Sequence, residues 1–171
     1  MYLDLNKLNR NYRILLYGYG NPGRKDDGLG PALIDMVEKW IIQERIKNVD
    51  VDSNYQLNIE DAYALRDYEK VIFIDASTED IEDYIVTRVR PSDKVNFSMH
   101  SVCPSFILHL CQRLYGYSPE TYLIHIKGYA FELQEGFSMQ ANRNLRRAYK
   151  YLQSVLSGTG SLAITTDFAI S

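Results

Sequence analysis

The spacing of apolar residues along the chain predicts alternating strands and helices. Three largely apolar runs, each followed by glycine or a charged residue, predict buried strands over residues 13–19, 70–75 and 122–128. Other segments carry apolar residues three and four positions apart, which is the spacing of one helix face. These segments predict helices over residues 29–41, 104–114 and 139–156.

Weaker patterns fill the intervals between these elements. Residues 49–52 predict a short strand, and residues 59–67 predict a short helix. Residues 84–90 alternate between apolar and polar side chains, which is typical of an edge strand with one solvent-exposed face. Only about seven residues separate this strand from the one before it, too few for a helical crossover, so we expect it to pair antiparallel.

The order of the predicted elements indicates an α/β fold. We expect a three-layer sandwich in which a mostly parallel, twisted sheet contains one antiparallel strand and carries helices on both faces. The 171 residues suffice for one domain, which we expect to span residues 1–157. Residues 158–171 show no strong pattern and are expected to form a C-terminal tail.

Composition narrows the class of protein. Hydrophobic residues make up 46% and charged residues 24%, as in globular domains. The net charge of −3 argues against a nucleic-acid-binding protein. Two cysteines are too few for a disulfide framework, and no apolar run approaches the about 18 residues of a membrane span. The first residues contain no apolar signal core, so the expected location is the cytoplasm.

Ionisable residues follow several predicted strands at the point where each strand ends. Asp26 and Asp27 follow the first strand, Asp75 ends the strand over residues 70–75, and His100 precedes the helix that begins at Pro104. Ligands of open α/β sheets bind beyond the carboxyl ends of the strands. Two carboxylates and an imidazole suit a divalent metal, which predicts a metal site formed by Asp27, Asp75 and His100.

Each of these residues also has an ordinary structural interpretation. Asp26 or Asp27 is a favoured residue type for capping the helix that follows, and Asp75 has the right character to cap a turn. A lone histidine in a loop is more often hydrogen bonded within the fold than bound to a metal. The pattern of residues leaves the metal site and these structural roles open.

The glycines of the first loop permit another function. Gly18, Gly20 and Gly23 match the spacing of a dinucleotide-binding loop, and Asp52 lies near the end of the second strand, where a ribose-binding acid would stand. Against this, Asp26 and Asp27 would face a pyrophosphate at the start of the helix, where like charges repel. A dinucleotide-binding α/β module is therefore the alternative function.

Two further features have both a structural and a functional interpretation. Cys103 precedes a predicted helix near His100, as in a Cys–His hydrolase, but no orienting acid is evident and a structural cysteine is favoured. On the last helix, four basic residues form one polar side, which is either solvated or a docking surface for an acidic partner; they are Arg143, Arg146, Arg147 and Lys150. We expect His109 and His125 to be structural.

Several motifs together resemble the nickel–iron hydrogenase maturation endopeptidases. Residues 18–30, with Asn21 and the acid pair, resemble the opening motif of that family. The family's later motifs are similar to four further segments, at residues 55–62, 71–76, 100–108 and 128–138. One departure is Cys103, which stands where a serine is common.

The resemblance implies an enzyme, a hydrolase of peptide bonds. It implies that the chain removes a C-terminal peptide from the nickel-loaded precursor of the hydrogenase large subunit, its protein partner. By position, Asp27, Asp75 and His100 correspond to the nickel-binding and catalytic residues. Some members carry Glu at the position of Asp27, so a shorter side chain reaches the metal here. The nickel is expected to arrive with the precursor, and the free enzyme is expected to be metal-empty.

Overall fold

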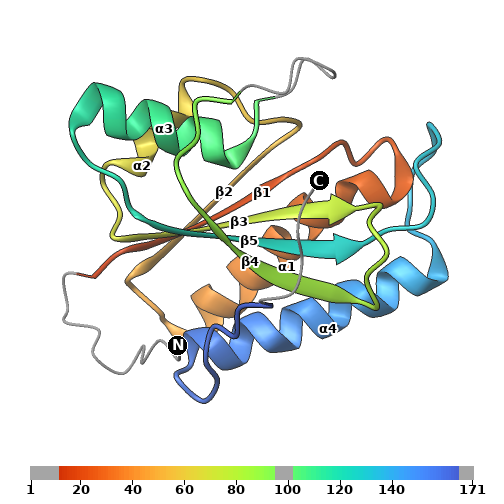
Figure 1. Ribbon diagram of the computed structural model, residues 1–171. Coiled ribbons are helices and arrows are strands. Elements are labelled where there is room, and N and C mark those ends of the chain that lie inside the picture. Colours follow the sequence, from red (N-terminus) through yellow and green to blue (C-terminus); the bar gives the residue numbers. More distant parts are fainter. Residues whose placement is uncertain (1–11, 95–101, 166–171) are drawn as a thin grey trace.

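The computed structural model describes residues 12–94 and 102–165, and these form a sheet between two layers of helices (Figure 1). The sheet in the described residues has five strands in the order β2-β1-β3-β5-β4. Its strands are β1 (Ile14–Tyr19), β2 (Val49–Asn54), β3 (Lys70–Ser77), β4 (Tyr84–Val89) and β5 (Glu120–Lys127). The helices are α1 (Leu29–Glu44), α2 (Asp61–Leu65), α3 (Pro104–Tyr115) and α4 (Met139–Leu156), and a 3-10 turn, η2 (Lys25–Gly28), precedes α1.

The two faces of the sheet bury separate clusters of side chains. On β3, Ile72 and Ile74 belong to the cluster beneath α1 and α4, whereas Val71 and Phe73 belong to the cluster beneath α2 and α3. Because successive side chains of a strand point to opposite faces, one continuous apolar strand supplies both cores. The predicted three-layer α/β sandwich is confirmed (Figure 1).

β4 is the one antiparallel strand and lies at an edge of the sheet, as its alternating pattern predicts. Its partner is β5, although β3 precedes it in the sequence. β3 pairs in parallel with β1 on one side and with β5 on the other, so no edge of β3 is left for β4. The short connection therefore carries the chain past the position that β5 later occupies.

Several boundaries differ from the predictions. β3 continues to Ser77, because Ala76 and Ser77 pair with β5, so Asp75 lies within the strand and does not end it. α2 is shorter than residues 59–67. On α3, Leu114 is exposed. Beyond α4, Leu162 is fully buried and the Thr165 amide donates to the Val86 carbonyl, so this stretch packs along the sheet edge.

No helix in the described ranges is long and apolar enough to cross a membrane.

An ionic cluster around one buried cation lies at the amino ends of β3 and β5. Lys70 is 1% exposed, and its ammonium lies 3.5 Å from the Glu120 carboxylate. The same carboxylate accepts from Arg88 at 2.9 Å and from the Tyr122 hydroxyl at 2.6 Å. Burial lowers the pKa of Lys70, and the charge of Glu120 opposes that shift. Glu120 is the group that makes burial of Lys70 tolerable.

Replacing Glu120 with Gln is expected to lower the free energy of unfolding by about 2 to 4 kcal/mol, because it leaves a buried cation without its counter-ion. Urea denaturation at pH 7 measures the change. The control is Asp50→Asn, which removes the exposed Arg13–Asp50 pair and should change stability by less than about 1 kcal/mol. Equal effects of the two substitutions would contradict the role of Glu120.

Candidate active site

The loop after β1 uses its backbone amides within the chain. Every amide N–H from Gly20 to Asp27 donates to the chain itself, Pro22 having none. The acceptors lie within the loop, on β2 and on the segment after β5; they are Asn54 O, Asp27 Oδ2, Asn21 Oδ1, Asn21 O, Gln134 O, Ala130 O and Arg24 O. A phosphate-binding loop needs free amides that point at the anion. This loop offers none.

The glycines of the loop serve the packing of the chain on itself. A Cβ on Gly18 would lie 2.5 Å from the Gly30 carbonyl oxygen, and one on Gly20 would lie 1.9 Å from the Asp27 carbonyl oxygen. Gly20 also has a φ of 136°, which side chains disfavour. Asp52 is exposed on β2 and accepts from the amide of the next residue. These contacts argue against the dinucleotide-binding alternative.

Asp26 is fully buried and joins the η2 turn to the segment between β5 and α4. Its carboxylate accepts four hydrogen bonds, from the amides of Tyr129, Ala130 and Ser138 at 2.7, 2.9 and 2.7 Å and from the Ser138 hydroxyl at 2.7 Å. Burial works to raise the pKa of Asp26, but these hydrogen bonds outweigh it and lower the pKa below the ordinary aspartate value.

Asp27 differs from its neighbour in burial and in contacts. It is half-buried, and its Oδ2 accepts from the Asn21 amide at 3.1 Å. Gly28 is the N-cap of α1, and no side chain in the described residues caps that helix. The structure therefore does not support the capping interpretation of Asp27. Its carboxylate is oriented by one backbone donor and is partly open to solvent.

Asp75 lies on the α3 side of the sheet, near the carboxyl end of β3. Burial raises its pKa to about 7, and the negative charge of Asp27 adds to this shift. A hydrogen bond from the Tyr19 hydroxyl and another from the Ala76 amide oppose it. Asp27 and Asp75 come from different elements, yet the charge of Asp27 acts on the ionisation of Asp75.

The sequence did not single out Tyr19, which contacts Asp75. Gly18 on β1 pairs with Ile74 on β3. Tyr19 and Asp75 are the next residues on these two strands, so they lie side by side. Burial, followed by the charge of Asp75, raises the pKa of Tyr19, which keeps the hydroxyl protonated as a donor. The contact between Tyr19 and Asp75 could have been predicted from the parallel register of the two neighbouring strands.

The third predicted ligand, His100, lies outside the described residues. Within residues 12–94 and 102–165, no group of three His, Cys, Asp or Glu side chains could hold a metal ion. Cys103, the N-cap of α3, lies close enough to Tyr19 to affect its pKa. Its Sγ is 3.1 Å from the Ser105 hydroxyl, which fits the structural role expected of it.

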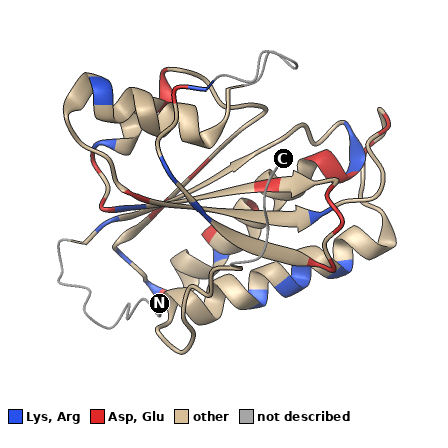
Figure 2. Ribbon diagram, viewed as in Figure 1, with Lys and Arg blue, Asp and Glu red and all other residues tan. Residues whose placement is uncertain are grey.

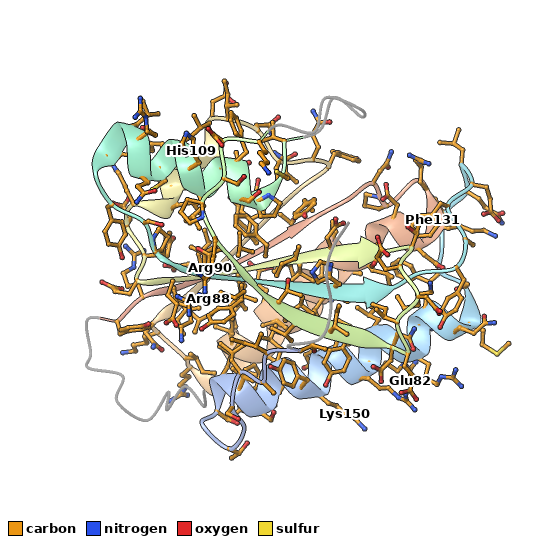
Figure 3. All side chains as sticks on the ribbon, viewed as in Figure 1. Glu82, Arg88, Arg90, His109, Phe131 and Lys150 are labelled. Carbon is orange, nitrogen blue, oxygen red and sulfur yellow. The ribbon has the colours of Figure 1, made fainter. Side chains whose placement is uncertain are left out.

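The two other histidines have structural surroundings. His125 pairs with Asp75 across β3 and β5, and its Nε2 lies 2.9 Å from the Thr87 hydroxyl. Burial lowers the pKa of His125 to about 4, so its ring is neutral near pH 7. His109 on α3 is half-buried and stacks on Phe106; Figure 3 shows it away from the carboxyl ends of the strands.

Replacing Asp26 with Asn is expected to lower the free energy of unfolding by about 2 to 4 kcal/mol at pH 7, because an amide NH2 would face a backbone donor. The pKa of Asp26 is lower in the folded state, so its contribution is present above the ordinary pKa of about 3.9 and fades as the pH falls below it. Denaturation at pH 7 and pH 3 measures the difference between variant and wild type.

The matched control for Asp26 is Glu132→Gln, which breaks the exposed Lys25–Glu132 ion pair between the same two segments. This substitution should change stability little. A loss in Asp26→Asn no larger than in the control, or a loss that grows at pH 3, would contradict the role of Asp26.

Replacing Asp75 with Asn is expected to raise the free energy of unfolding at pH 8 by at least about 1 kcal/mol, because it removes a buried charge. The folded pKa of Asp75 is raised to about 7, so ionisation reduces stability as the pH rises from about 4 to 7. At pH 5 the gain should be much smaller. Urea denaturation at both values tests this, and a variant less stable than wild type at pH 8 would contradict it.

Solved structures share this fold. The hydrogenase 2 maturation peptidase from Thaumarchaeota archaeon SCGC_AB-539-E09 superposes with a TM-score of 0.61 at 21% identity, covering 84% of this chain and 97% of that chain. The [NiFe] hydrogenase maturation protease HycI from Thermococcus kodakarensis KOD1 superposes with a TM-score of 0.66 at 18% identity. The match covers 85% of this chain and 92% of that chain. The hydrogenase maturating endopeptidase HybD from E. coli superposes with a TM-score of 0.66 at 17% identity. The match covers 89% of this chain and 96% of that chain.

Comparison of the sequence alone finds no relative, in contrast to comparison of the structure. No protein-family model matches the chain, and no curated protein matches it. The likeness therefore lies in the three-dimensional arrangement, and it extends over nearly the whole length of each of these solved structures. The chain has the fold of the hydrogenase maturation proteases, the family that its sequence motifs resemble.

Proposed function

We propose that the chain is a nickel-dependent endopeptidase that removes a C-terminal peptide from the nickel-loaded precursor of a hydrogenase large subunit. The observation that carries this proposal is the pair of carboxylates, Asp27 and Asp75, on different elements at the carboxyl edge of a fold shared with hydrogenase maturation proteases. Neither carboxylate caps α1, and burial makes the charge of Asp75 unfavourable. A carboxyl group with a raised pKa in such a place, as Asp75 has, favours a functional role.

In this proposal the nickel is part of the substrate. Asp27 and Asp75 offer oxygen ligands, and His100 offers an imidazole nitrogen, a set that suits a divalent metal. Thiolates of the precursor would supply the softer ligands. Three ligands hold a metal weakly, which agrees with a free enzyme that acquires nickel only together with its protein substrate.

The surroundings of the two carboxylates support this role. The Asn21 amide orients the Asp27 carboxylate, and the Tyr19 hydroxyl donates to Asp75. A carboxylate must be ionised to bind a metal, and the Tyr19 hydroxyl favours the ionised form of Asp75. When bound, a metal polarises the scissile carbonyl or lowers the pKa of a water molecule. In this proposal Asp27, Asp75 and His100 hold the metal, so that the scissile peptide bond lies beside the metal.

The expected location remains the cytoplasm, which is a prediction from the sequence. The protein partner is the precursor itself, and no nucleic acid takes part in the proposed reaction.

The test of the function is incubation with purified nickel-loaded large-subunit precursors, scored by mass spectrometry for loss of a C-terminal peptide. Wild type is expected to cleave at least one precursor. Asp75→Ala and His100→Ala should each lower the rate more than about 100-fold, because each removes a group that holds the metal beside the reacting bond.

Two controls accompany this assay. Asp52→Ala removes an exposed acid outside the candidate site and should cleave at the wild-type rate. Precursor without nickel should remain intact. Undiminished cleavage by Asp75→Ala, or equal cleavage of the nickel-free precursor, would rule out the proposed role of the site.

A further inference from the structure

The outward side of α4 carries a row of exposed cations. The cations are Arg143, Arg146 and Lys150, and the apolar Met139 precedes them on the same side. The spacing of three or four residues between neighbours places all four along one side of the helix. Figure 2 shows the Lys and Arg positions along this helix, and in Figure 3 the Lys150 side chain points away from the sheet. The opposite side of α4, with Ala141, Leu145 and Ala148, is buried against the sheet.

Most of these cations have no ion-pair partner among the residues that the structure describes. Arg147, beside the row, contacts Asp83 at 3.0 Å. For Arg143, Arg146 and Lys150, no carboxylate in the described part of the chain lies within 4.0 Å. Grouped cations of one sign on a protein of net charge −3 create a local positive field that attracts an anionic partner.

The row borders a shallow groove. A hollow of about 470 Å³ runs along α1 and α4 and is lined by Met36, Asn142, Arg146, Tyr149, Lys150 and Gln153. Apolar atoms of methionine and tyrosine therefore lie beside two of the cations. A partner that fits this groove carries both acidic and apolar side chains.

Two large apolar side chains are exposed at the start of α4 and in the segment before it. Met139 is 87% exposed at the start of α4, and Leu133 is 85% exposed in the preceding segment. That segment is held to the η2 turn by the carboxylate of Asp26 and by the Lys25–Glu132 pair. We call the surface formed by Leu133, Met139, Arg143, Arg146 and Lys150 the α4 surface.

We propose that the α4 surface binds an acidic segment with apolar side chains on the protein that this chain processes. The inference rests on the proposed function for the identity of that protein. Cations next to large exposed apolar side chains suit an amphipathic acidic peptide, which gains electrostatic steering and apolar burial together. A bound segment would hold the precursor beside Asp27.

Two other anionic partners fit the surface less well. A helix that lies on a membrane presents an apolar face along its length, but the apolar face of α4 is buried in the core. Nucleic-acid sites distribute many cations along a backbone, whereas this surface has three cations without an ion pair to the described residues, on an acidic protein. Both partners are included in the test.

The first test measures binding without catalysis. The probe is a synthetic helical peptide with Glu on one face and Leu on the other, titrated against the full chain by fluorescence anisotropy. The variant R143E/R146E/K150E is expected to weaken binding at least about tenfold at 50 mM salt, and the difference should shrink at 500 mM salt. The neutral variant R143Q/R146Q/K150Q should show a smaller loss in the same direction.

The matched control is K47E/K94E/R113E, which makes the same change in net charge at exposed positions on other parts of the fold. It should bind the peptide as wild type does. Circular dichroism melting of all variants checks that they are folded. An equal loss in this control would overturn the proposal, as would a reversal variant that binds the peptide normally but loses binding to anionic vesicles or to single-stranded DNA.

The second test uses the precursor cleavage assay. R143E/R146E/K150E is expected to raise KM at least about tenfold while kcat stays within about twofold, because docking is impaired and the reacting groups are intact. An unchanged KM would overturn the role of the surface. If wild type cleaves no precursor but the peptide result holds, the proposed function fails and the α4 surface stands as a binding surface for acidic segments.

Discussion

The buried carboxylate of Asp26 is the contact on which the arrangement of the candidate site depends. It accepts hydrogen bonds from residues that lie 103 to 112 positions later in the sequence, and so joins the turn before α1 to the segment before α4. A buried carboxylate is unfavourable unless its oxygens are satisfied, and four donors satisfy this one. Because Asp26 takes up these bonds, the adjacent Asp27 remains half-buried with a single amide donor. One residue of the acid pair holds two segments together, and the other keeps a carboxylate that is partly exposed.

Asp75 has the opposite energetic character. Its burial opposes ionisation, and in the part of the chain that the structure describes only the Tyr19 hydroxyl and one amide act against that burial and against the charge of Asp27. The buried Lys70 at the other end of β3 has a counter-ion, Glu120, which two further groups hold in place. Within residues 12–94 and 102–165, the charge at one end of this strand therefore has a counter-ion and the charge at the other end has none. Such a group fits a site whose compensating charge arrives with the substrate.

Much of the fold follows from local sequence, and the parts that do not follow depend on contacts between distant segments. The bounds of α4 agree with the prediction because its apolar spacing and the capping hydroxyl of Ser138 are local signals. The partner of β4 could not be predicted, since it depends on β5, which comes later in the chain. The same limit applies to the acid pair. Nothing local distinguishes Asp26 from Asp27, because the donors that bury Asp26 come from the segment after β5. Tyr19 was within reach of prediction, since parallel register places it beside Asp75.

The segment between β5 and α4 connects the two proposed activities. Its amides hold Asp26, and its exposed Leu133 and the following Met139 begin the α4 surface. A protein segment bound there would press on the same loop that positions Asp27. Docking and metal recognition would therefore share one set of hydrogen bonds. Under these two proposals, the acidic segment and the metal of one substrate would act on segments that the Asp26 carboxylate joins.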